Sequence, residues 1–175
     1  MKTLKHTITI MAIVVFTLLT GTTFAQATAS ATATATIVAP IGIANSVDMN
    51  FGNVAVSTSL GTVVLTPAGT RTVTGGVTLP VVTGTVAAAE FDVTGEGTYT
   101  YSITLPSGDY TITNTTGAGA ETMAVNTFTS TPITTGTLSG GTQTLTVGAT
   151  LNVTGSQVAG VYTNATGFDV TVNYN

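Results

Sequence analysis

Apolar and hydroxyl-bearing residues alternate along much of the chain, with a period of two rather than the 3.6 residues of an α-helix. The apolar faces consist of Tyr99, Tyr101, Ile103 and Leu105 in residues 98–105, of Leu145, Val147, Ala149, Leu151 and Val153 in residues 142–153, and of Phe168, Val170, Val172 and Tyr174 near the C-terminus. Valine, isoleucine, threonine and tyrosine suit a pleated surface. The pattern predicts half-buried β-strands.

Short runs rich in glycine and proline separate these stretches, at intervals of roughly eight to twelve residues. They fall at residues 66–69, 75–76, 95–97, 106–109, 117–119 and 140–141. No stretch resembles the crossover helix that joins two parallel strands. We therefore predict an all-β fold, an antiparallel immunoglobulin-like β-sandwich in which two sheets pack face to face.

The N-terminus has the pattern of a cleaved secretory signal peptide. Lys2 and Lys5 precede an apolar run over residues 8–19, and small residues follow up to Ala25. The apolar run is shorter than the roughly 20 residues that a helix needs to span a bilayer. We predict that residues 1–25 are removed, with Ala27 as an alternative cleavage position, and that no membrane span is left. The protein is then periplasmic, exposed on the cell surface or extracellular.

The predicted mature chain begins with a segment of low complexity. Alanine alternates with threonine or serine over residues 26–36, and Ile37, Val38 and Pro40 follow. One interpretation is a loose leader, or simply a first strand, because terminal residues are often poorly ordered. The other is a strand that docks in a groove of a partner. We assign residues 26–40 to this N-terminal strand or leader and residues 41–175 to the β-sandwich domain.

Charge and composition exclude several classes of function. Loss of Lys2 and Lys5 with the signal peptide changes the formal charge from −4 to −6 and leaves Arg71 as the only fixed cation. The basic surface that binds nucleic acid or anionic lipid is therefore not expected. The chain contains no cysteine, so its stability has to come from a hydrophobic core rather than from disulfides.

The same composition argues against catalysis. His6 lies in the predicted signal peptide, so the mature chain has no histidine, cysteine or lysine to act as a general base, a nucleophile or a zinc ligand. Two carboxylates can hydrolyse a glycosidic bond, but such sites lie in aromatic-lined clefts and this chain has no tryptophan. We predict that the protein is not an enzyme and uses no cofactor.

Three carboxylates, Glu90, Asp92 and Glu96, lie close together in the sequence and could offer oxygen ligands to Ca²⁺. They lack the Asp and Asn spacing of a calcium loop. Glu90 and Asp92 also alternate with Phe91 and Val93, which places them on the expected solvent side of a strand. Calcium binding and plain solvent exposure are both open from the sequence, and we assign no metal ligand.

Two further groups of residues have alternative interpretations. Arg71 could bind a carboxylate of a partner, or it could be a solvated strand residue or part of an exposed salt bridge. Tyrosine rings could stack on sugars, or they could cover the core and point their hydroxyls to water. The tyrosines are Tyr99, Tyr101, Tyr110, Tyr162 and Tyr174.

Several segments resemble a secreted bacterial family known only as a domain of unknown function. They are residues 33–43, 49–53, 61–65, 91–96, 99–106 and 168–175. The last strand, with Tyr174 next to the end, also resembles that of chaperone–usher pilins and spore coat U type domains. That resemblance implies an N-terminal strand that completes a neighbouring subunit, and a periplasmic chaperone as a partner. Many such pilins have a cysteine pair, which this chain lacks.

Together these features predict a secreted structural or interaction protein of the bacterial cell surface, a self-assembling pilin-like subunit. A threonine-coated surface of low charge carries little self-repulsion, and edge strands without lysine are open to pairing. The alternative is a monomeric binding module for carbohydrate or for a protein partner.

Overall fold

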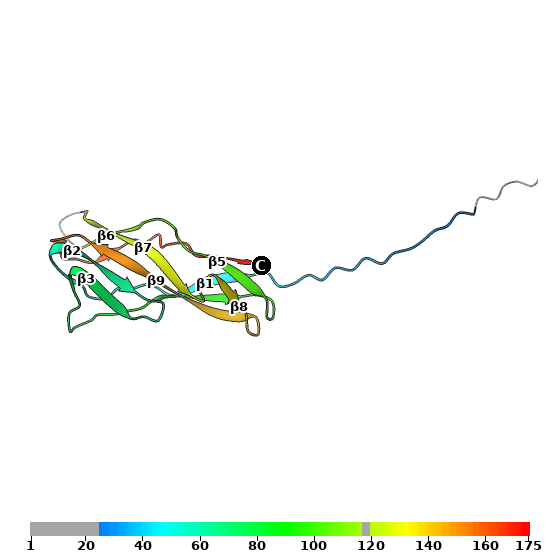
Figure 1. Ribbon diagram of the computed structural model, residues 1–175, viewed down its shortest axis with the longest axis horizontal. Coiled ribbons are helices and arrows are strands. Elements are labelled where there is room, and N and C mark those ends of the chain that lie inside the picture. The colour runs from blue at the N-terminus through cyan, green and yellow to red at the C-terminus, as the bar shows by residue number, and fades with distance from the viewer. Residues whose placement is uncertain (1–24, 117–119) are drawn as a thin grey trace, which may run out of the picture. The chain divides into compact units, whose positions relative to one another are not determined.

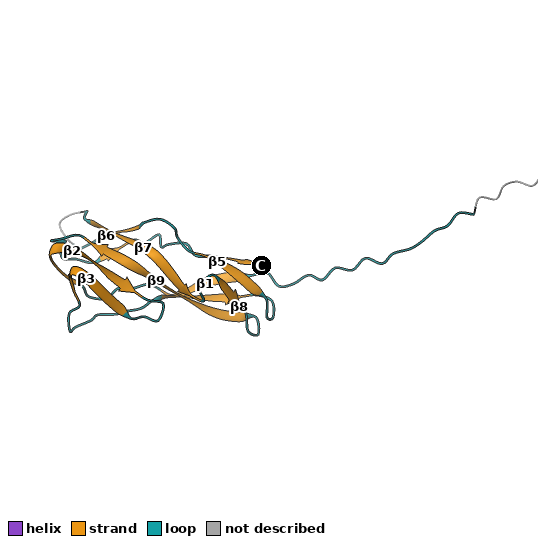
Figure 2. Ribbon diagram, viewed as in Figure 1, coloured by secondary structure: helices purple, strands orange, loops and turns teal. Residues whose placement is uncertain are grey.

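The computed structural model describes residues 25–116 and 120–175. Within these ranges the chain forms β-strands and no helix, as the sequence predicts (Figure 2). The strands are β1 (Gly42–Val47), β2 (Ala55–Leu65), β3 (Arg71–Thr78), β4 (Ala89–Thr94), β5 (Thr100–Thr104), β6 (Tyr110–Asn114), β7 (Thr122–Thr131), β8 (Thr135–Thr137), β9 (Thr142–Val153), β10 (Tyr162–Thr163) and β11 (Thr171–Tyr174). The chain divides into two units, residues 1–36 and residues 37–175, and the second unit contains all of these strands.

The strands form two sheets (Figure 1). The larger sheet has the order β1-β4-β9-β7-β6-β10, and β2 also pairs with β9 and carries β3 on its other side. The smaller sheet has the order β11-β5-β8. Every strand pairing in the described ranges is antiparallel. The predicted antiparallel, sandwich-like all-β fold is confirmed.

Strand β9 holds the larger sheet together. Its first half pairs with β4, its second half pairs with β2, and β7 lies along its other edge. The predicted apolar face of this strand is buried throughout, at Leu145, Val147, Ala149, Leu151 and Val153. The alternation read from the sequence is therefore the alternation between core and opposite face in the folded domain.

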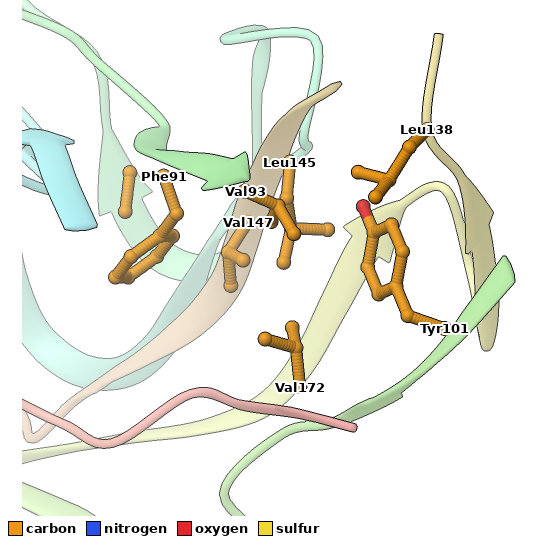
Figure 3. Packing of buried hydrophobic residues seen from close by; sticks show 8 residues of the cluster. Phe91, Val93, Tyr101, Leu138, Leu145, Val147 and Val172 are labelled. Carbon is orange, nitrogen blue, oxygen red and sulfur yellow. The ribbon is translucent and has the colours of Figure 1, made fainter. Parts of the chain in front are cut away.

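The core consists of two clusters of buried side chains. Cluster 1 contains Ala89, Phe91, Val93, Tyr101, Leu138, Leu145, Val147 and Val172, so both sheets contribute to it. Figure 3 shows Val172 and Tyr101 of the smaller sheet pointing toward Leu145 and Val147 of the larger sheet. Cluster 2 contains Val63, Val77, Val125, Ala149, Leu151 and Val153 of the larger sheet alone.

Phe168 links aromatic side chains that pack on both clusters. Its ring centroid lies 4.9 Å from that of Phe128, 5.8 Å from that of Tyr110 and 6.3 Å from that of Phe91. Phe128 packs against both clusters, whereas Tyr110 packs against cluster 2 and Phe91 belongs to cluster 1. These rings therefore connect the two parts of the core.

Some predicted boundaries differ from the structure. β5 is shorter than residues 98–105, and Tyr99 lies before it with 47% of its surface exposed. β11 begins only at Thr171, so Phe168 and Val170 pack against the core from outside the strand. Phe168 and Val170 thus contact the core without a hydrogen-bonded strand partner, and alternation in the sequence does not distinguish such residues from residues of a strand.

The turn predicted at residues 75–76 is wrong, because both residues lie within β3. The register between β2 and β3 shifts here, and residues 57–60 of β2 bulge out opposite Gly75 and Gly76. Gly75 has a φ of +64°, and a Cβ atom on it would lie 2.3 Å from the Leu60 carbonyl oxygen. These glycines mark a bulge where two backbones approach closely.

The other predicted turns lie between strands at residues 66–69, 95–97, 106–109 and 140–141, and residues 117–119 lie outside the described part. The predicted signal peptide also lies outside the described residues, except for Ala25. In the part of the chain that the structure describes, no helix has the length and apolar character needed to cross a membrane.

Candidate functional site

Residues 25–36 precede the unit that contains the strands. All of them are exposed and none belongs to a strand. Ile37, which follows, is 96% exposed, whereas Val38 is half-buried. The alternating segment therefore offers its backbone and both of its faces to solvent.

Two hydrogen bonds tie the start of the domain down at Ala39. The Ala39 N–H donates to Glu96 Oε2 at 3.0 Å, and the Tyr174 hydroxyl donates to the Ala39 carbonyl oxygen at 2.9 Å. The Glu96 N–H donates to the same hydroxyl at 2.6 Å. Glu96 and Tyr174 thus form an anchor that joins the entry of the chain to the turn after β4 and to the last strand.

Among the described strands, five form the edges of the two sheets. These are β1, β3 and β10 in the larger sheet and β8 and β11 in the smaller one. In the described ranges β1 pairs with β4 alone and β11 pairs with β5 alone. Unpaired edges of this kind expose rows of N–H and C=O groups that another strand can pair with.

The edges of β1 and β11 come close together beside cluster 1, where their Cα atoms approach within 8 Å. Ile41 and Ile43 pack against the cluster from the β1 side, and Val170 and Tyr174 do so from the β11 side. All four are only half-buried. We call this rim, made of Ile41, Ile43, Val170 and Tyr174 between two strand edges, the β1–β11 seam.

The three carboxylates that could have bound calcium are not brought together. Glu90 is half-buried and Asp92 is exposed, whereas Phe91 and Val93 between and beside them are buried, so both carboxylates lie on the face of β4 opposite the core. Glu96 is in the turn and accepts the hydrogen bond from Ala39. Among the described residues no three acidic, histidine or cysteine side chains lie close enough to hold a metal ion.

Arg71 has a role that the sequence did not predict. Its Nη1 atom donates to the carbonyl oxygens of Phe51, at 2.5 Å, and Asn53, at 3.0 Å. Gly52 between them has a φ of +66°. The guanidinium therefore holds the irregular segment before β2, and neither the ion pair nor the solvated residue considered above describes it. Because every residue has a main-chain carbonyl, the sequence does not indicate which carbonyls Arg71 binds.

Most of the tyrosines also differ from expectation, because the hydroxyls of Tyr101, Tyr110, Tyr162 and Tyr174 bond within the domain. Tyr101 is fully buried and donates to Gln143 Oε1 at 2.8 Å. Tyr110 donates to the Asn164 carbonyl at 3.0 Å, and Tyr162 donates to the Val158 carbonyl at 2.6 Å. Burial raises the pKa of Tyr101 and that of Tyr110. The fully buried ring of Tyr101 is therefore closed to sugar stacking.

A shallow hollow of about 320 Å³ lies between the β5–β6 loop and the segment before β11. Its lining comprises Pro106, Gly108, Asp109, Tyr110, Gly167, Phe168 and Asp169. Asp109 accepts a hydrogen bond from Asn126 Nδ2 at 2.8 Å. Two carboxylates beside two aromatic rings could contact a polar ligand, and the sequence alone gave no signal that these loops meet.

A family model described as "Domain of unknown function (DUF4402)" matches residues 41–174. The chain belongs to this family. The DUF4402 match contains every strand of the structure, and it excludes residues 26–40. The resemblance to a domain of unknown function is thereby confirmed. No curated protein and no solved structure matches the chain.

Proposed function

We propose that this DUF4402 protein is a secreted structural subunit of a bacterial cell surface, and that it self-associates through residues 26–36. The observation that carries the proposal is the exposed, strictly alternating segment, which belongs to no strand although it leads directly into a strand-rich domain. An extended chain of this kind can add as a strand to the open edge of another sheet.

The energetics of such an addition would rest mainly on the backbone. Each alanine brings little apolar area, roughly one methyl group, or about 0.8 kcal/mol of burial. A row of main-chain hydrogen bonds and the larger Ile37, a residue that is 96% exposed, would supply the rest. Threonine on the opposite face keeps the added strand compatible with water.

The composition supports a non-catalytic role. After His6 the chain has no histidine, cysteine or lysine, and Arg71 is engaged with main-chain carbonyls. The alternative function, a monomeric binding module, is supported by the hollow beside Asp109 and Asp169. The two proposals differ in whether the protein forms multimers.

The test is the oligomeric state of residues 26–175 compared with residues 37–175, measured by size-exclusion chromatography with light scattering. Deletion of residues 26–36 removes no strand and no buried side chain, so both proteins should melt at the same temperature at concentrations low enough for both to be monomeric. We expect multimers that grow with concentration for the longer protein and a monomer for the shorter one.

A matched control replaces residues 26–36 with a Gly/Ser segment of equal length, which lacks alternation and is flexible. This variant should be monomeric. If residues 26–175 stay monomeric at high concentration and protease removes the segment rapidly, the self-association proposal is wrong and the monomeric binding module is favoured.

A further inference from the structure

We infer that the shallow hollow between the β5–β6 loop and the segment before β11 is a binding site for a neutral saccharide. The inference goes beyond the proposed function, because every residue that lines the hollow belongs to the unit of residues 37–175 and none lies in residues 26–36. The reasons are the preformed walls of the hollow, the hydrogen-bond acceptors of its lining and the two aromatic rings beside them.

Hydrogen bonds within the domain hold the two walls of the hollow together. The Tyr110 hydroxyl donates to the Asn164 carbonyl oxygen at 3.0 Å, and Asn164 Nδ2 donates to the Thr111 carbonyl oxygen at 2.8 Å. The rings of Tyr110 and Phe168, one from each wall, pack edge to face at a centroid distance of 5.8 Å. Because the hollow is formed by the fold itself, binding of a ligand does not require these loops to become ordered.

A chain of side-chain amides orients one of the two carboxylates in the hollow. Asn126 Nδ2 donates to Asp109 Oδ1 at 2.8 Å, and Asn126 Oδ1 accepts in turn from Asn152 Nδ2 at 3.1 Å. The second carboxylate, that of Asp169, is exposed and makes no hydrogen bond among the described residues. Since an ionised carboxylate accepts about four hydrogen bonds, both Asp109 and Asp169 keep acceptor sites for a ligand.

The side chains that line the hollow offer acceptors and no free donor. Their one hydroxyl, that of Tyr110, already donates to Asn164. A ligand therefore has to bring its own donors, and the hydroxyl groups of a sugar do so, in hydrogen bonds that an ionised acceptor strengthens. The two carboxylates would repel a phosphate, a sulfate or an acidic sugar, so the matching ligand is neutral.

The size and the apolar part of the hollow also suit a sugar. Its volume of about 320 Å³ lies near the lower limit of the roughly 300–1,000 Å³ that is typical of small-molecule sites. Tyr110 and Phe168 are only half-buried, so parts of both rings remain in contact with solvent. A pyranose has C–H groups on its faces and hydroxyls around its rim, so it can cover these rings while its hydroxyls reach the carboxylates.

Positively charged ligands fit the hollow less well. Ca²⁺ takes six to eight oxygen ligands, and no three acidic side chains of the described residues lie close enough to hold a metal ion. An organic ammonium ion binds over the faces of aromatic rings, but the planes of Tyr110 and Phe168 are 75° apart, so the edge of one ring covers a face of the other. Asp109 and Asp169 are also exposed, and salt screens ion pairs at the surface.

Saturation-transfer difference NMR on residues 26–175 tests the inference, because the method detects weak ligands of a protein in any oligomeric state. The probes are the methyl pyranosides of glucose, galactose and mannose, each titrated alone, and tetramethylammonium as the cationic alternative. We expect at least one pyranoside to bind with a Kd of about 1 mM, the affinity of a small ligand in an open site. Raising NaCl from about 0.05 M to about 0.5 M should leave this Kd unchanged, because no ion pair is involved.

Substitutions of single carboxylates locate the bound sugar. Asp169→Ala removes a carboxylate that bonds to no described residue and should raise the Kd about tenfold. Asp109→Asn keeps an acceptor oxygen for Asn126 and should raise the Kd by a smaller factor. The matched control is Asp92→Ala, which removes an exposed carboxylate that does not line the hollow and should leave the Kd unchanged. Thermal melts check that each variant is folded.

Three results would overturn the inference. One is the absence of saturation transfer to all three pyranosides at concentrations well above the expected Kd. Another is a Kd that Asp169→Ala leaves unchanged, or that Asp92→Ala raises equally, because the sugar would then lie outside the hollow. The third is tighter binding of tetramethylammonium that NaCl weakens, which would assign the hollow to a cation. Each of them leaves the proposed self-association standing, since chromatography tests that proposal separately.

Discussion

Replacing Phe168 with alanine should destabilise the whole domain. Phe168 lies outside any strand, yet its ring contacts Phe91, Tyr110 and Phe128, which pack on both core clusters. A fully buried phenylalanine costs about 3–5 kcal/mol when truncated to alanine, and each aromatic pair adds about 0.5–1.5 kcal/mol. Phe168 is half-buried, so we expect a loss near the lower limit, about 3 kcal/mol.

The assay is urea unfolding followed by circular dichroism, because the chain has no tryptophan to report on folding. With a slope of about 1–3 kcal/mol per molar urea, the loss corresponds to a midpoint lower by about 1–3 M. The matched control is Tyr99→Ala. Tyr99 is 47% exposed and has a single ring contact, at 5.6 Å from Tyr174, so its truncation should cost about 1 kcal/mol.

An equal cost for Phe168→Ala and Tyr99→Ala would refute the reasoning, since it would mean that the ring of Phe168 does not connect the clusters. The slope of the transition is a second check. If both variants keep the slope of the natural protein, the difference in midpoint is a difference in stability and not a change in the unfolded state.

Three further predictions follow from named contacts. Tyr174→Phe keeps the ring and removes the hydroxyl that bonds to Ala39 and Glu96, so unfolding in urea should show a loss of about 0.5–1.5 kcal/mol. Burial raises the pKa of Tyr101 and of Tyr110, so the folded state keeps protons that the unfolded chain loses at high pH. The contribution of these tyrosines to the free energy of unfolding should be complete below pH about 10 and should fall as the pH rises above it. Thermal melts at a series of pH values measure this. Val172→Asp buries an unpaired charge at a 7% exposed position and should abolish soluble expression, whereas Val170→Asp at a half-buried position should cost less.

The central strand could be predicted from the sequence because its alternation reports directly on burial. In β9 five consecutive alternate residues face the core, and a single-residue shift would expose all of them. The ends of β5 and β11 could not be predicted, since Tyr99 and Phe168 continue the alternation beyond the hydrogen-bonded ladder. Likewise, a glycine pair has the same appearance in a turn and in the bulge at Gly75.

Only one part of the candidate site, the alternating segment, could be predicted from the sequence. The alternation of residues 26–36 is a local property, so it can be read directly. The anchor is not local: Ala39 lies 57 residues from Glu96 and 135 residues from Tyr174. Nor does any sequence pattern indicate that β1 and β11, which are far apart in the chain, have Cα atoms within 8 Å of each other.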